Sequence, residues 1–232
     1  MTRPRSWWPD AAFVAAFVLI TVLLARGHLF GLDAAVADWS DAHRPPVAYW
    51  TARVLNSLGQ GGWLLMPVAG LLVALLAWRR RSIRPLLVFL GATLLTYLSL
   101  GPMKILFQRA APRFEGPDRT ALFNPAAVGQ AGMSYPSGHV ANAVIWYVVI
   151  AFGLTGLIGA LGRRVTLALR VLPPAIVFGT TTYLSWHWIT DSIAGLFLGL
   201  VLARLLARVP WETLPLPGPV ARFERPFTPS VR

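Results

Sequence analysis

The sequence has no cysteine, a single lysine and only nine acidic residues among 232. Without cysteine, the chain can form no disulfide, no thiolate metal site and no cysteine nucleophile. Charged residues make up 13% of the chain, well below the share of about 25% in an average soluble domain. Hydrophobic residues make up 56%. Scarce charge and abundant apolar residues together argue against a water-soluble fold and favour a membrane protein.

Long uncharged runs predict six membrane-spanning helices. A helix crosses a bilayer with about 20 mostly apolar residues. Three runs meet this length on their own and three shorter or interrupted runs complete the set: 54–78, 85–103 and 140–162, then 11–25, 165–186 and 192–208. We therefore expect an all-α, polytopic membrane domain over residues 1–209. Residues 210–232 are rich in proline and arginine and are expected to form a cytoplasmic tail.

The first run has a second interpretation. Arg3 and Arg5 precede an apolar stretch, and residues 35–37 read Ala-Val-Ala, so the pattern also fits a cleavable signal peptide. The candidate cleavage site lies far beyond the apolar run, which favours a retained membrane helix.

The placement of cations orients the predicted helices. Membrane proteins concentrate Lys and Arg on the cytoplasmic side, and a cytoplasmic N-terminus puts 14 of the 21 cations inside. Four of the other seven lie in one outside loop: Lys104, Arg109, Arg113 and Arg119. Both termini are therefore predicted to be cytoplasmic. Heavy use of Arg also favours a bacterial plasma membrane, and the net charge of +12 needs no nucleic-acid partner.

Residues 26–53 are predicted to form an outside loop, with amphipathic turns lying on the membrane surface. His28, His43 and nearby aspartates offer metal-ligand chemistry, but a solvated loop is the favoured interpretation, so no metal site is predicted. Gly195 and Gly199 are spaced for one helix face, which predicts close packing against another helix.

Three polar clusters are predicted to lie together on the outer side. The first runs from Lys104 to Arg113, the second is Pro-Ser-Gly-His at 136–139, and the third surrounds His187. Phosphoryl transfer needs cations and backbone donors around the phosphate, an in-line nucleophile and an acid for the leaving oxygen. A helix that begins at the Pro-Ser-Gly-His segment would offer free N–H groups to an anion.

The third cluster pairs a histidine with a carboxylate. His187 and Asp191 are four residues apart, so on a helix they would share a face. The carboxylate would hold one imidazole N–H and leave the other nitrogen free to attack phosphorus, and His139 would supply the proton for the leaving oxygen.

These residues resemble the motifs of the type 2 phosphatidic acid phosphatase (PAP2) superfamily, membrane lipid phosphatases with six helices and their relatives. The family motifs are Lys, six residues, Arg-Pro; then Pro-Ser-Gly-His; then Ser-Arg, five residues, His, three residues, Asp. Lys104 and Pro112 match the first motif, residues 136–139 match the second in full, and His187 and Asp191 match the third. The resemblance covers a core at about 84–206.

The resemblance implies a role for each matching residue. His187 would form a phosphohistidine, Asp191 would orient it, and His139 would protonate the leaving group. The implied substrate is a lipid phosphate or pyrophosphate in the outer leaflet, handled without a metal or other cofactor. The implied phosphate ligands are Lys104, Ser137 and Gly138.

Two motif arginines are absent, because Ala111 and Thr181 occupy their positions. Loss of one such preorganised donor typically costs about 10²–10³ in rate. Arg109, Arg113 or Arg119 could replace the missing cations from a shifted loop, and Thr181 could still donate a neutral hydrogen bond.

The sequence thus supports a metal-independent lipid phosphatase as the leading hypothesis. The alternative is a phosphotransferase that moves a phosphoryl-bearing head group between lipid or glycan carriers, which would need fewer cations than hydrolysis of a monoester dianion. A third hypothesis is a non-catalytic lipid-binding protein descended from an enzyme. The sequence makes no prediction of oligomeric state.

Overall fold

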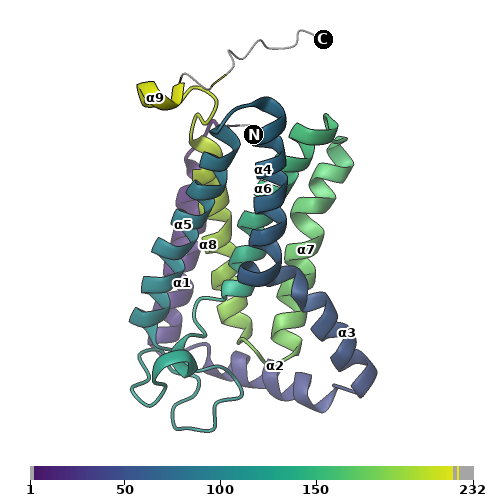
Figure 1. Ribbon diagram of the computed structural model, residues 1–232. Helices are drawn as coiled ribbons and strands as arrows, with labels where there is room; N and C mark the ends of the chain where they lie inside the picture. The colour runs from purple at the N-terminus through teal and green to yellow at the C-terminus, as the bar shows by residue number, and fades with distance from the viewer. Residues whose placement is uncertain (1–2, 222–223, 225–232) are drawn as a thin grey trace.

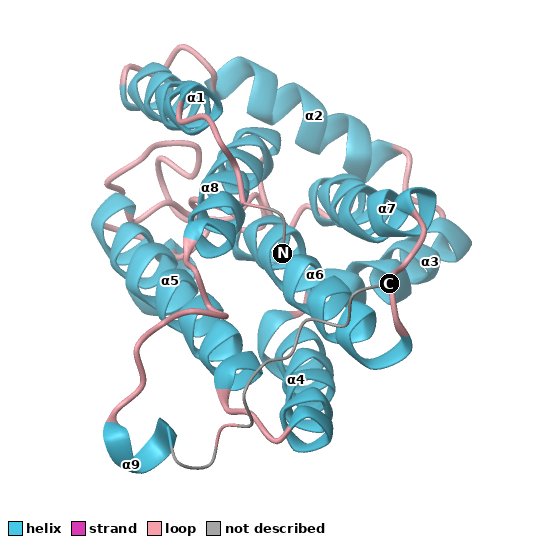
Figure 2. Cartoon of the chain, turned by 90° about the horizontal axis from the view of Figure 1, so that it is seen from above, coloured by secondary structure: helices cyan, strands magenta, loops and turns pink. Residues whose placement is uncertain are grey.

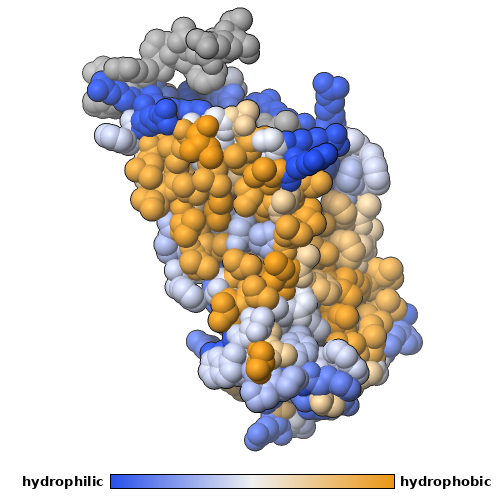
Figure 3. Space-filling view, turned by 90° about the vertical axis from the view of Figure 1, so that its right-hand side faces the viewer, coloured by the Kyte–Doolittle hydropathy of each residue, from blue (hydrophilic) through white to orange (hydrophobic). Residues whose placement is uncertain are grey.

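The computed structural model describes residues 3–221 and residue 224, and within them the regular elements are helices (Figure 1). Six of these helices are long and apolar enough to cross a membrane. They are α1 (Trp8–Ala25), Gly61–Arg80 including α4 (Met66–Arg80), α5 (Arg84–Phe107), α6 (Gly138–Ile158), α7 (Arg163–Tyr183) and α8 (Ile189–Arg208). Figure 3 shows the resulting apolar band between two hydrophilic ends. The predicted all-α, multi-pass fold is confirmed.

The second span begins later than the sequence predicted. The expected run 54–78 is divided into α3 (Pro46–Asn56), a short 3₁₀ turn (Ser57–Gly59), a π-helical turn (Gly61–Leu65) and α4. The segment packs closely against α6, because a Cβ at Gly61 would lie 2.6 Å from the side-chain amide of Asn142. The candidate membrane span therefore begins at Gly61 and not at Val54.

Two helices replace the loop predicted at 26–53. They are α2 (Phe30–Ala42) and α3, which cross one end of the bundle and pack against α7 (Figure 1). Trp39 and Val47 are largely exposed, as amphipathic helices on a membrane surface would be.

The central helix is α6, which packs against α4, α7 and α8 (Figure 2). Close approach depends on glycine, as predicted: a Cβ at Gly199 would lie 2.9–3.1 Å from atoms of Val144 and Ala141, and one at Gly195 would lie 2.5 Å from the carbonyl oxygen of Ser137. The start of α6 is therefore held directly against α8.

The helix α1 contacts the rest of the structure near both of its ends. Asp10 pairs with Arg204 at 2.9 Å and also with Arg208, both on α8, and Thr21 hydrogen-bonds to Tyr135 at 2.7 Å. The first apolar run is thus packed as a membrane helix in the structure.

The predicted tail begins against the bundle. Trp211 contacts Gly91 of α5, and Glu224 pairs with Arg84 at 3.1 Å. A four-residue helix, α9 (Gly218–Ala221), lies between them. The rest of the segment predicted as a cytoplasmic tail, residues 222–223 and 225–232, lies outside the described residues.

Candidate active site

A cavity of about 310 Å³ opens at the end of the bundle that carries α2 and α3. It collects side chains from the end of α5, the start of α6 and the loop before α8. Its polar lining comprises Gln60, Lys104, His139, Asn142 and His187, and the remainder is Gly59, Gly61, Gly62, Met133 and Gly138. The three clusters predicted to lie together on one side therefore meet at one cavity.

Lys104 supplies the cation of this cavity. It lies in the last turn of α5, and its Nζ donates to the carbonyl oxygen of Met133 at 2.5 Å. A Cβ at Gly138 would lie 3.4 Å from Cε and 3.8 Å from Nζ of this lysine. The ammonium group is thus adjacent to the first residue of α6, where an anion would meet both a charge and a helix N-terminus.

Ser137 caps α6 and does not line the cavity. Its side chain accepts from the amide of Val140 at 3.4 Å, and its own amide donates to the carbonyl of Asp191 at 3.0 Å. Within the described part of the chain, the amides of Gly138 and His139 have no protein partner. These two N–H groups, at residues that line the cavity, remain available to a phosphate oxygen.

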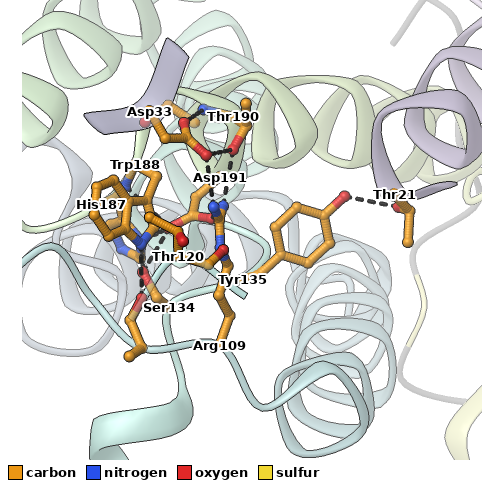
Figure 4. Close-up of polar contacts among 12 residues, drawn as sticks. Thr21, Asp33, Arg109, Thr120, Ser134, Tyr135, His187, Trp188, Thr190 and Asp191 are labelled. Atoms are coloured by element: carbon orange, nitrogen blue, oxygen red, sulfur yellow. Dashed lines mark hydrogen bonds and ion pairs between the residues drawn. The ribbon is translucent and has the colours of Figure 1, made fainter. Parts of the chain in front are cut away.

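Among the described residues, the imidazole of His187 is hydrogen-bonded through Nδ1 alone (Figure 4). Its Nδ1 lies 3.1 Å from Oγ of Ser134, and that hydroxyl donates to Oδ2 of Asp191 at 2.5 Å. Because the hydroxyl proton is directed to the carboxylate, Nδ1 carries the imidazole proton and Nε2 keeps its lone pair. The direct distance from Nδ1 to Asp191 is 3.5 Å, so the predicted histidine–carboxylate pair acts mainly through Ser134.

Burial keeps His187 neutral. The side chain is 7% exposed, and desolvation lowers the pKa of this histidine below its ordinary value, although the hydrogen bond to Asp191 opposes the shift. A neutral imidazole with a free Nε2 is the form that a nucleophile requires.

Arg109 lies behind the carboxylate and not in the cavity. Its side chain is fully buried, with ion pairs of 2.5 Å to both Asp191 and Asp33. It also donates to Thr190 at 2.8 Å and to the carbonyl of Thr120 at 2.9 Å. The prediction that Arg109 binds substrate does not fit this placement, since two carboxylates and two further acceptors already occupy the guanidinium.

Asp33 completes a buried chain of charges that joins α2 to α8 (Figure 4). It accepts from the amide and the hydroxyl of Thr190 at 3.1 and 2.7 Å. Burial alone would lower the pKa of Arg109, but the neighbouring Asp191 and Asp33 raise it. Arg109 therefore stays positive and holds the Asp191 carboxylate in a fixed orientation.

His139 faces His187 from the first turn of α6. The ring centroids of His139 and His187 are 5.5 Å apart, and Trp186 lies 5.6 Å from His139. Its Nε2 is buried and finds no partner in the described residues. A substrate oxygen in the cavity would meet this nitrogen, which can hold or release a proton there.

Comparison with known proteins agrees with this geometry. The model of the PAP2 superfamily matches residues 85–214, which is more than half of the chain. The chain belongs to the PAP2 superfamily. A solved transmembrane PAP2-type phosphatidylglycerolphosphate phosphatase from Bacillus subtilis has the same fold, with a TM-score of 0.71 and 22% identity over 86% of this chain and 94% of that chain. A search of curated proteins found no match.

The PAP2 motif positions divide into two layers in the structure. Lys104, Gly138, His139 and His187 line the cavity, whereas Ser137 and Asp191 support it from behind. Thr181 is fully buried, its Oγ1 has no partner in the described residues, and it does not line the cavity. Arg113 is exposed on the loop after α5. The predicted contacts of Thr181 and Arg113 with substrate remain predictions.

Sequence reasoning missed three polar residues at the PAP2 site. Ser134 and Asp33 carry no motif signal, because the segments that hold them are joined to the site only by folding. Asn142 could have been found, since it lies four residues after Gly138 on the same face of a helix. Its Oδ1 accepts from Trp146 at 3.1 Å, and its amide nitrogen faces Gly61 and Gly138.

A fourth missed residue, Arg53, lies near the cavity on α3. Its guanidinium is 5.8 Å from the ring centroid of Trp186, the neighbour of His139, and donates to the hydroxyl of Tyr49 at 3.1 Å. The hydrogen bond from Arg53 lowers the pKa of Tyr49, and the charge of Arg113 adds to the effect. Two arginines therefore approach one tyrosine near the cavity.

Proposed function

We propose that the protein is a lipid phosphatase that removes a phosphoryl group from a lipid phosphate or pyrophosphate at the extracytoplasmic face. Membership of the PAP2 superfamily supports a membrane phosphatase in general. The observation that carries the specific proposal is one cavity in which a neutral, supported His187 faces His139 and Lys104. The cation distribution along the chain supports the assignment of this cavity to the outer side of a bacterial plasma membrane.

The residues suggest a two-step reaction. Nε2 of His187 attacks phosphorus while His139 donates a proton to the leaving lipid oxygen, so that a P–N bond forms and a P–O bond breaks. Water then attacks the phosphohistidine, giving its proton to His139 and releasing phosphate with a regenerated imidazole. Lys104 and the amides of Gly138 and His139 would stabilise the charge that develops on the phosphoryl oxygens.

The lipid has a path to this cavity. A second cavity of about 210 Å³ shares Gly61, Gly62, Lys104, Gly138 and Asn142 with the first. Its remaining lining comes from α4 and α5, and consists of Met66, Thr96, Tyr97, Leu100 and Gly101. A lipid with its phosphate at Lys104 could thus place its apolar chain between α4 and α5. This arrangement supports a lipid substrate.

Arg53 and Arg113 are the cations that we assign to binding of the charged head group as it enters the cavity. Arg109 is engaged by carboxylates, and Arg119 donates to the carbonyl of Pro112 while lying over Trp188. Arg53 remains exposed beside Trp186. We expect Arg53→Ala to raise KM with little change in kcat, because an entry contact contributes to binding before the chemical step.

The deciding experiment measures phosphate release from a defined lipid phosphate by the purified protein in the presence of a chelator. We expect His187→Ala to abolish release, and His28→Ala, which changes an exposed histidine on the same face, to leave it intact. Trapping of ³²P on protein from a labelled substrate, absent in the His187→Ala variant, would identify the intermediate. Full activity of His187→Ala would refute the proposal.

A second candidate is phosphoryl transfer to an acceptor other than water. The observation that favours it is the single cation in the cavity lining, Lys104, which suits a phosphodiester better than a monoester dianion. Incubation with a labelled donor lipid, with and without acceptor lipids or glycan carriers, separates the two reactions. Transfer is excluded if water accepts the group at the full rate and no acceptor becomes labelled.

A further inference from the structure

A larger cavity, of about 340 Å³, lies at the opposite end of the bundle from the histidines, between α6, α7 and α8. Figure 2 looks onto this end, where residues of the N-terminal segment pass toward α6. Three arginines line the cavity: Arg3, Arg170 and Arg204. Its other walls are apolar apart from backbone, and comprise Pro4, Val144, Val148, Leu200, Ala203 and Ala207. The cavity therefore combines a cationic rim with an aliphatic interior.

Arg170 lies at a position in α7 where its charge needs a neutralising partner. It is the eighth residue of α7, about 10 Å along the helix from its inner end at 1.5 Å per residue. A charged side chain so far along a membrane helix is costly in hydrocarbon and is stabilised by an anion or by water that reaches it. Over residues 3–221 and 224, Arg170 forms no ion pair with a protein carboxylate.

The acidic residues nearby do not neutralise the cavity. Asp10 pairs with both Arg204 and Arg208, so these three side chains together keep a net positive charge. Glu212 lines a neighbouring cavity of about 50 Å³ together with Arg3, but the two form no ion pair in the described chain. The lining arginines thus exceed the carboxylates that contact them.

We propose that this cavity binds an anionic phospholipid of the leaflet opposite the histidine site, with its phosphate between Arg170, Arg3 and Arg204 and an acyl chain along Val148 and Leu200. Charge complementarity selects an anionic head group, and the aliphatic wall selects a lipid over a soluble anion. Basic pockets between membrane helices are suited to such head groups. The inference concerns a site separate from the proposed phosphatase cavity and does not depend on its activity.

The test is lipid retention by the full-length protein, measured by native mass spectrometry after delipidation and titration with phosphatidylglycerol or phosphatidylcholine of identical chains. We expect phosphatidylglycerol to be retained in preference to phosphatidylcholine. Arg170→Gln should weaken retention about fivefold, the effect of ~1 kcal/mol for one basic residue beside an anionic lipid. Ala207→Leu, which fills the cavity without changing its charge, should weaken it as well.

Arg164→Ala is the matched control, because Arg164 is an exposed arginine of the same helix that does not line the cavity. Repeating the titration with Lys104→Ala separates this site from the substrate cavity, since the Arg170-dependent lipid should persist there. Equal retention of the two lipids, equal loss in Arg164→Ala, or displacement by inorganic phosphate alone would overturn the proposal.

Discussion

At the level of single residues, Ser134 supports His187, the proposed nucleophile. Its hydroxyl lies between Nδ1 of His187 and the Asp191 carboxylate. A hydrogen bond to a charged group is worth about 1.5–3 kcal/mol, so Ser134→Ala should lower kcat by about 10- to 100-fold with little effect on KM. Ser134→Thr keeps the hydroxyl and should restore most of the rate. If Ser134→Ala leaves kcat unchanged, the hydroxyl is not a support for the nucleophile.

The protonation of His187 makes a second prediction at this scale. Activity requires the neutral imidazole, and burial lowers the pKa of His187, so the loss of kcat/KM on acidification should occur below pH 6.5. A histidine with the ordinary pKa of about 6.5 would retain about a third of its pH 7 activity at pH 6; we expect this protein to retain more. The measurement is kcat/KM against pH, with a return to pH 7 to exclude denaturation. An acid limb at or above pH 6.5 would contradict the assignment.

At the level of helices, the contact between α6 and α8 sets the geometry of the site. A Cβ at Gly195 would lie 2.5 Å from the carbonyl oxygen of Ser137. Because Ser137 is the N-cap of α6, its backbone cannot move independently of that helix. Gly195→Ala should therefore cost about 1–3 kcal/mol of stability and lower activity, because the bond from the Ser137 amide to Asp191 depends on the same contact.

Gly179→Ala provides the control for this prediction. Gly179 lies in α7, and a Cβ at this position would have no neighbour within 4 Å beyond the backbone of its own helix. Alanine favours a helix over glycine by about 0.5–1 kcal/mol. Thermal unfolding in detergent should show a lower Tm for Gly195→Ala and no loss for Gly179→Ala. Equal behaviour of the two variants would show that the α6–α8 contact tolerates a side chain.

The sequence predicted the helices better than it predicted the contacts between them. The six spans could be predicted because a helix that crosses a bilayer needs a long uncharged run in the sequence. By contrast, only amphipathic turns were predicted at α2 and α3, since each helix is short and Asp33, within α2, is a charged residue that is buried. Arg109 was assigned to substrate because spacing along the chain cannot show that Asp33, 76 residues away, and Asp191, 82 residues away, would take its donors. The motif histidines and Lys104 were predicted to meet, and they do.

At the level of the whole molecule, the orientation in the membrane can be tested directly, because the chain has no cysteine of its own. Glu115 and Arg80 are exposed at opposite ends of the bundle. A membrane-impermeant maleimide added to intact cells should label Glu115→Cys, and should label Arg80→Cys only after permeabilisation. The reverse pattern would place the histidine cavity in the cytoplasm and remove the proposed outer-leaflet substrate.

The buried charges around Arg109 also have a consequence for biosynthesis. Asp33 precedes Thr190, its partner, by 157 residues, and Arg109 lies between them. The groups that support the proposed nucleophile thus leave the ribosome early, midway and late, and they can meet only after the final span has been synthesised. An unfinished polypeptide consequently lacks the buried chain of charges that orients His187.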